Sequence, residues 1–317
     1  MRGMAHFDPK KFVEEKTKIL EGEIGSDVCI VALSGGVDSS VTAVLGFKAA
    51  GGNLKAVFLE DGFMRIGESE RIKRVFKNIG MDVAVYDVQR EFLTALKGIR
   101  DAEKKRKAFR DTFYKTFSKI AREAGAKIIL QGTIAADIVE TRGGVKTQHN
   151  VLEQIGINPF EKYGFRILEP LKEIYKNQVR LIAKELGLPD EIVNRRPFPG
   201  PGLSIRILGE VTEERLSIIK KATSIVDDEL ADIKCFQAFP VLLEGRATGI
   251  GANLSRKYGY MVALRIVESE DAMTAKHVRL DWNRFDKISH RILTEIPEVS
   301  RVLYDITDKP PATIEFE

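Results

Sequence analysis

The chain has 317 residues, of which 44% are hydrophobic and 30% are charged, and these proportions are typical of a globular protein with about two domains. Its formal net charge of +4 suits an anionic substrate and does not require a nucleic acid partner. The two cysteines form no Cys-x-x-Cys pair, so neither a zinc site nor a disulfide framework is indicated. No segment resembles a signal peptide or approaches the roughly 18 apolar residues of a membrane span, and we expect a cytoplasmic protein.

Strands and helices are expected to alternate through the first half of the chain. Apolar runs predict buried strands at 28–33, 54–59, 82–86 and 127–130, and helical periodicity covers 9–24, 41–49, 67–79, 90–99 and 101–123. This alternation predicts an α/β fold with right-handed βαβ units around a parallel, doubly wound sheet. Because ligands bind beyond the carboxyl ends of such strands, the loops at 34–40, 60–62 and 131–133 are expected to share one edge.

The second half of the chain is predicted to hold a lid and a smaller domain. Residues 141–166 are polar and glycine-rich without periodicity, which favours a lid over the site. After a helix at 175–186, the proline- and glycine-rich segment 195–202 predicts a boundary between domains 1–195 and 196–317. The second domain is expected to be α+β, with helices at 212–230 and 281–296 and strands at 239–243, 260–267 and 299–304.

The segment between the first strand and its helix carries the clearest chemical signal. It consists of Ser34, Gly35, Gly36, Val37, Asp38, Ser39 and Ser40. Free N–H groups at a helix N-terminus favour an anion, and glycine lets the main chain approach it closely, so we expect a phosphate-binding loop. The lysine of a Walker A loop is absent, and Asp38 would repel a phosphate unless a cation lay between them. Mg²⁺ is the predicted mediator.

The loop resembles the pyrophosphate loop of the N-type ATP pyrophosphatases, or PP-loop enzymes. These enzymes cleave ATP between its α and β phosphates and adenylylate an oxygen of their substrate. From about Phe7 to the last residue, the chain is similar to the ATP-pyrophosphatase subunits of GMP synthase, of the separate-subunit type found in archaea. The similarity rests on the segments 34–40, 131–133, 146–150, 197–202, 271–275 and 305–317.

This resemblance implies a ligase that uses ATP, Mg²⁺, XMP and ammonia. The C2 oxygen of XMP would be adenylylated with release of pyrophosphate, and ammonia would then displace AMP to give GMP. A separate glutamine amidotransferase (glutaminase) subunit would supply the ammonia in a heterodimer, because neither cysteine lies in a Gly-x-Cys-x-Gly elbow. The C-terminal domain would form a homodimer, and no nucleic acid or membrane partner is expected.

The resemblance also implies a role for individual residues. Asp38 would bind Mg²⁺, Lys146 in the lid would neutralise the α phosphate, and His149 would act beside it. Gly132 would join the phosphate loop in binding ATP. The residues implied for XMP are Arg196 or its neighbour Arg195, Lys309, Ile314 and Glu315.

Departures from the family pattern leave alternatives open. Gln148 stands where the family has a histidine. The pair Glu60-Asp61 leaves open which of the two carboxylates would bind a metal ion or the ribose. One alternative is a PP-loop enzyme acting on tRNA, for which the basic run 104–107 could bind RNA. Another is a catalytically silent ATP-binding regulator, because the lid differs at 148 and 151–163. NAD synthetase ranks lower, since it lacks the pattern of residues 309–317.

Overall fold

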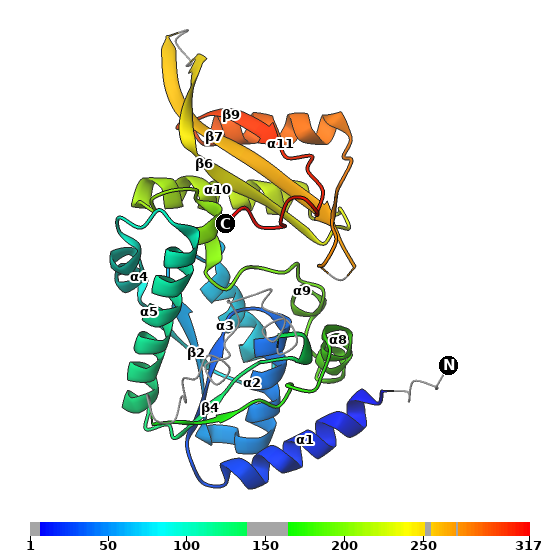
Figure 1. Ribbon diagram of the computed structural model, residues 1–317. Coiled ribbons are helices and arrows are strands. Elements are labelled where there is room, and N and C mark those ends of the chain that lie inside the picture. The colour runs from blue at the N-terminus through cyan, green and yellow to red at the C-terminus, as the bar shows by residue number, and fades with distance from the viewer. Residues whose placement is uncertain (1–6, 138–163, 251–254, 271) are drawn as a thin grey trace. The chain divides into compact units, whose positions relative to one another are not determined.

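The computed structural model describes residues 7–137, 164–250, 255–270 and 272–317 (Figure 1). The chain divides into two compact units. The first unit comprises residues 1–60, 68–87 and 114–195, and the second comprises 61–67, 88–113 and 196–317. One passage between the units falls after Arg195, and two segments of the first half, 61–67 and 88–113, pack with the second unit. The domains 1–195 and 196–317 stay a prediction.

A five-stranded parallel sheet forms the centre of the first unit. Its strands are β1 (Cys29–Leu33), β2 (Leu54–Glu60), β3 (Val83–Asp87), β4 (Ile128–Leu130) and β5 (Arg166–Leu168), in the order β3-β2-β1-β4-β5. Cys29 on β1 pairs with Leu54 on one side and Ile128 on the other. The strand order reverses between β1 and β4, and such a switch point is where doubly wound sheets bind their ligands. The predicted α/β fold class is confirmed.

The helices of the first unit are α1 (Pro9–Ile24), α2 (Val37–Ala50), η1 (Gly51–Asn53), α3 (Glu68–Asn78), the second part of α5 (Ala102–Glu123), α8 (Lys176–Glu185) and α9 (Asp190–Val193). Of these, α2 and α3 pack directly on strands of the sheet. Helices α1, α2 and α8 pack against one another (Figure 1). The sequence did not predict β5 or α9, and Arg166, expected at the end of the lid loop, begins β5. A strand of three residues is too short to show a period.

The second unit is built on an antiparallel hairpin with a parallel strand beside it. Its elements are α4 (Gln89–Leu96), η2 (Gly202–Arg206), α10 (Glu213–Glu229), β6 (Gln237–Ile250), β7 (Arg256–Glu268), β8 (Lys276–His277), α11 (Trp282–Glu295) and β9 (Val299–Tyr304). β7 pairs antiparallel with β6 and β8 and parallel with β9. β6 and β7 exceed their predicted lengths because their far halves, which are mostly exposed, contain no apolar run. In Figure 1 the two strands continue side by side as a long hairpin.

Aromatic packing explains why 61–67 and 88–113 belong to the second unit. The ring of Phe109 lies 5.8 Å from that of Phe63 and 4.6 Å from that of Phe92. The backbone N–H of Leu203 donates to the carbonyl of Phe63 at 2.8 Å, and Lys105 Nζ donates to the carbonyl of Ile207 at 2.6 Å. Among the described residues, no helix is both long and apolar enough to cross a membrane.

Candidate active site

The predicted phosphate loop connects β1 to α2 with a geometry that suits an anion. Gly35 has a φ of 76°, and Gly36 is the N-cap of α2 in an extended conformation. No side chain of the described residues caps α2, and the first N–H groups of a helix have no partner within it. The N–H groups of Val37 and Asp38 therefore remain available at the positive end of the helix dipole.

Serine hydroxyl groups hold this loop together. Ser39 Oγ donates to the carbonyl of Gly36 at 3.1 Å and lies 3.0 Å from Ser34 Oγ. Both donors of the buried Ser40, its N–H and its hydroxyl, go to the same Gly36 carbonyl, at 3.1 and 2.8 Å. We therefore expect Ser40 to stabilise the loop and leave phosphate contacts to the other members.

Asp38 presents one paired and one unpaired oxygen. Its Oδ2 accepts from Lys176 Nζ at 2.5 Å, at the start of α8. Its Oδ1 is buried and has no hydrogen-bond partner among the described residues. Mg²⁺ characteristically takes one or two carboxylate oxygens together with phosphate oxygens, so this orphaned oxygen beside a phosphate loop fits such an ion. No group of three or more His, Cys, Asp or Glu side chains in the described ranges is placed to hold a metal by itself.

The loop after β4 lies directly against the phosphate loop. A Cβ on Gly132 would lie 3.1 Å from the backbone carbon of Asp38 and 3.1 Å from the nitrogen of Ser39, so only glycine fits without a shift. Next to it, Thr133 Oγ1 donates to Glu169 Oε1 at 2.5 Å. The expected meeting of two loops at one sheet edge is therefore observed for 34–40 and 131–133.

The two predicted acidic residues after the second strand fall in different units, and the predicted lid residues lie outside the described ranges. Glu60 is the last residue of β2, in the first unit, whereas Asp61 belongs to the second unit and accepts from the N–H of Phe63 at 2.7 Å. Lys146, Gln148 and His149 lie outside the described residues. Their roles stay predictions.

The two arginines at the boundary have different partners. Arg195 forms an ion pair with the buried Glu68 and donates to the carbonyl of Gly35, all within the first unit. Arg196 donates to the carbonyls of Leu230 and Ile233, at the end of α10 in the second unit. The sequence left open which of the two binds XMP.

Glu315 is held by a buried arginine that the sequence did not single out. Arg206 Nη2 donates to Glu315 Oε1 at 2.9 Å, and Gln237 Nε2 lies 3.3 Å from the same oxygen. The guanidinium carbon of Arg206 lies over the ring of Phe198 at 4.9 Å and over that of Phe239 at 4.0 Å from the centroids. Its position in a short 3₁₀ turn gave no periodic signal.

A second buried arginine organises the rest of this segment. Arg265 on β7 is fully buried and forms an ion pair with Asp305 at 3.1 Å. It also donates to the carbonyls of Thr307, Thr313 and Ile314. The side chain of Ile314 packs in a core cluster that includes Phe239. Lys309 Nζ donates to the carbonyl of Ala272 at 2.8 Å.

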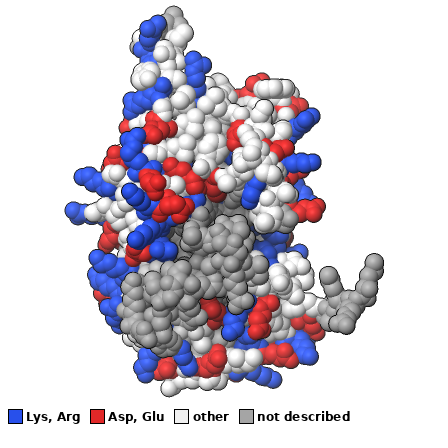
Figure 2. Space-filling view, viewed as in Figure 1, with Lys and Arg blue, Asp and Glu red and all other residues white. Residues whose placement is uncertain are grey.

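The basic run at 104–107 is only partly available to a partner. Lys105 is fully buried and pairs with Glu317 at 2.5 Å, and burial lowers the pKa of its ammonium. Arg106 donates to the backbone carbonyl of Glu317. On the visible face of the molecule, Lys and Arg are interspersed with Asp and Glu (Figure 2). Two cations of the run therefore serve the fold of the second unit.

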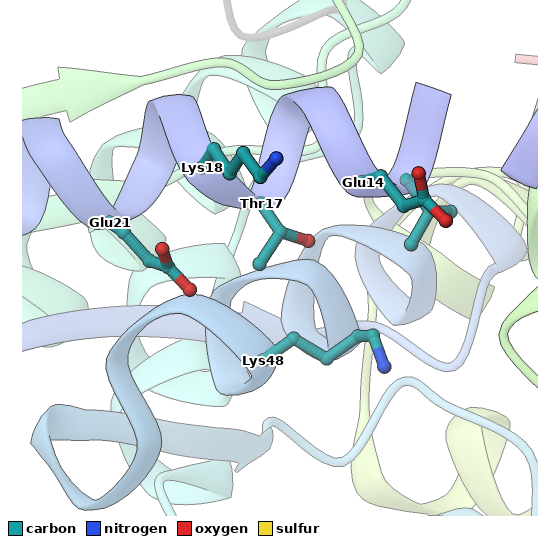
Figure 3. A pocket seen from close by; sticks show the side chains of 6 residues that line it. Glu14, Thr17, Lys18, Glu21 and Lys48 are labelled. Carbon is teal, nitrogen blue, oxygen red and sulfur yellow. The ribbon is translucent and has the colours of Figure 1, made fainter. Parts of the chain in front are cut away.

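A pocket on the first unit lies away from these residues in the sequence. It is lined by Val13, Glu14, Thr17, Lys18 and Glu21 of α1 and Lys48 of α2 (Figure 3). None of these residues belongs to the predicted ATP or XMP sites. Charged side chains are common where two surface helices meet, so we assign no function to this pocket.

A glycine-serine loop at the switch point of a parallel sheet, in a chain that continues into an α+β unit, defines a PP-loop ATP pyrophosphatase. Two family models agree with this class: "NAD synthase" matches residues 10–216, and "GMP synthase C terminal domain" matches residues 224–316. More particularly, the chain belongs to the family of ATP-pyrophosphatase subunits of glutamine-hydrolyzing GMP synthase, which makes it part of a ligase.

Full-length relatives establish this membership. The chain is 49% identical to the corresponding GMP synthase subunit of Methanocaldococcus jannaschii, over 98% of this chain and 100% of that protein. It is 48% identical to that of Methanopyrus kandleri, again over 98% and 100%. The solved NMN synthetase of Francisella tularensis covers 62% of this chain and 79% of its own, with 19% identity and a TM-score of 0.49, too low to inform function.

Proposed function

We propose that this chain converts XMP to GMP with ATP and ammonia, releasing AMP and pyrophosphate. The observation that carries the proposal is the near-half identity along the full length to subunits of glutamine-hydrolyzing GMP synthase. The phosphate loop, with its available N–H groups and orphaned Asp38 oxygen, supports the ATP half of the reaction.

The proposed reaction has two balanced steps. The C2 oxygen of XMP attacks the α phosphorus, a new P–O bond forms, the adjacent ring N–H gives up its proton, and the bond to the β phosphate breaks with loss of pyrophosphate. Ammonia then attacks C2, the C2–O bond breaks, AMP leaves with the oxygen, and the nitrogen loses a proton. An amide-like purine oxygen is a poor leaving group until it is a phosphate ester. The protein therefore has mainly to position the reactants and stabilise charge.

In this proposal the phosphate loop holds the triphosphate through its N–H groups, and Asp38 holds Mg²⁺. The ion, when bound, supplies neutralisation of phosphate charge. Lys146, in the lid at about 141–166, is proposed to neutralise the α phosphate, and His149 is proposed as a further catalytic residue of the same segment.

XMP recognition is proposed for the second unit. Glu315 is fixed by Arg206 and Gln237, so its carboxylate is a preorganised acceptor for purine N–H groups. Ile314 would contribute its backbone, because its side chain is packed in the core. Lys309 and Arg196 complete the proposed set.

The partners of the chain are part of the proposal. The relatives are named as one subunit of a glutamine-hydrolyzing enzyme. We propose that a separate glutaminase subunit supplies ammonia, that the second unit forms a homodimer, and that the enzyme works in the cytoplasm.

The test uses the purified chain with ATP, Mg²⁺, XMP and ammonium salt, following XMP loss by absorbance and pyrophosphate release in parallel. Asp38→Asn keeps the side-chain shape and should abolish pyrophosphate release while circular dichroism stays unchanged. Asp27→Asn, which alters a surface ion pair with Lys127, is the matched control and should keep full rate. Absence of XMP loss in the wild type, or near-normal turnover of Asp38→Asn, would contradict the proposal. Glutamine in place of ammonium should give no GMP.

A further inference from the structure

A buried ion pair lies directly against the phosphate loop. Arg195 Nη1 donates to Glu68 Oε1 at 2.6 Å, and Nη2 donates to Oε2 at 2.5 Å, a two-point contact that fixes the guanidinium plane. The side chain of Glu68 is 2% exposed and that of Arg195 is 13% exposed. Arg71, one turn along α3, donates to Glu68 Oε1 at 3.1 Å. The pair is therefore held from two sides.

This pair contacts the loop at Gly35. Arg195 Nη1 also donates to the carbonyl oxygen of Gly35 at 2.8 Å. A Cβ on Gly35 would lie 2.4 Å from Arg195 Nη1 and 2.4 Å from Glu68 Oε1, so the pair fills the space beside the loop completely. Gly35 also has a positive φ of 76°, which disfavours other residues.

The contact fixes the direction of one peptide group. In a trans peptide the C=O and the following N–H point in opposite directions. Because the Gly35 carbonyl is turned toward Arg195, the Gly36 N–H must point away from it. That N–H donates a long hydrogen bond of 3.4 Å to Ser34 Oγ, another member of the phosphate loop.

We propose that Arg195 and Glu68 are positioning residues that hold the Gly35–Gly36 peptide so that the Gly36 N–H faces the phosphates of ATP. The inference rests on the proposed function, since it takes the loop to bind ATP. It assigns Arg195 to the support of the phosphate loop and leaves Arg196 as the candidate for XMP. Neither positioning residue needs to touch ATP itself.

The test measures binding of inorganic pyrophosphate in the presence of Mg²⁺ by calorimetry, together with the KM values for ATP and XMP. Arg195→Met should weaken pyrophosphate binding about tenfold or more, because one hydrogen bond to a charged acceptor is misdirected. Arg195→Met also takes the two-point partner from the buried Glu68 carboxylate and is prone to misfolding. The double variant Arg195→Met/Glu68→Met removes both charges together and should show the same loss with an intact fold.

Controls separate positioning from general stability. Arg74→Met removes an exposed arginine of α3, the helix that carries Glu68, and should keep the wild-type affinity for pyrophosphate. In the double variant, the KM for ATP should rise while the KM for XMP stays unchanged. Arg195→Lys, which supplies a cation but not the two-point contact, should recover only part of the loss.

The outcomes distinguish two failures. A wild type that makes GMP, with a double variant that binds pyrophosphate normally or raises only the KM for XMP, overturns this inference alone. A wild type that neither binds pyrophosphate nor makes GMP overturns the proposed function and the inference with it.

Discussion

Replacement of Arg265 by methionine tests whether one guanidinium holds the segment 305–317 in place. Methionine keeps much of the buried stem but loses all four polar contacts. Three backbone carbonyls and the mostly buried carboxylate of Asp305 would lose their partner. Removal of one member of a buried pair costs about 3–5 kcal/mol, because the other member stays desolvated and unpaired.

This energy should appear as local opening of the segment. The N–H of Asp305 donates to the carbonyl of Leu264 at 3.0 Å, and the N–H of Lys309 donates to the carbonyl of Ala275 at 2.8 Å. Native-state hydrogen exchange at such amides reports the free energy of local opening. A loss of about 3–5 kcal/mol corresponds to at least about a hundredfold faster exchange in Arg265→Met. The KM for XMP should rise as well, since this segment carries the proposed XMP contacts.

Arg279→Met is the matched control, because Arg279 is an exposed arginine of the same unit. Its exchange should equal that of the wild type. Equal protection of the Asp305 and Lys309 amides in Arg265→Met would refute the reasoning. Packing of the Ile314 side chain in the core would then be sufficient to hold the segment.

Two further predictions concern the first unit. Gly132→Ala should slow pyrophosphate release about tenfold or more, because its methyl group would displace the backbone at Asp38. Gly52→Ala is the control, since a Cβ there would have no atom within 4 Å, and it should keep the wild-type rate. Equal rates of the two variants in a pyrophosphate assay would count against the close contact. Burial raises the pKa of the Cys29 thiol from 9.0 to about 11. The unfolded chain therefore loses this proton at lower pH than the folded chain, and the free energy of unfolding should fall as pH rises from 9 to 11. Mass spectrometry should find Cys29 alkylated at pH 8 in urea but not in the native chain. Rapid native labelling at pH 8 would show that the thiol is accessible.

The parts of the fold with strong local patterns could be predicted from the sequence. The strands β1 to β4 are short apolar runs next to turns, and α1 and α10 begin at capping residues, Asp8 and Thr212. The strand β5 and the helix α9 were missed because three or four residues carry no usable period. The far halves of β6 and β7 were missed because they are stabilised by pairing and not by burial.

The candidate site divides in the same way. The phosphate loop is contiguous in sequence and could be located from its residues. The partners of its members are distant: Lys176 lies 138 positions from Asp38, and Arg195 lies 127 positions from Glu68. Such pairs depend on how helices stack on the sheet, which one sequence does not reveal. For the same reason the sequence does not indicate that Arg265 is fully buried.

The division into units has a consequence for dissecting the protein. The chain passes from one unit to the other after residues 60, 67, 87, 113 and 195. A fragment that begins at residue 196 would therefore lack Phe63, Phe92 and Phe109, together with the Lys105 ammonium that pairs with Glu317. Such a fragment would expose apolar surface to water and leave a carboxylate unpaired. The proline-rich segment 195–202 is therefore a poor place to truncate the protein, and we expect the second unit to fold only when the preceding residues are expressed with it.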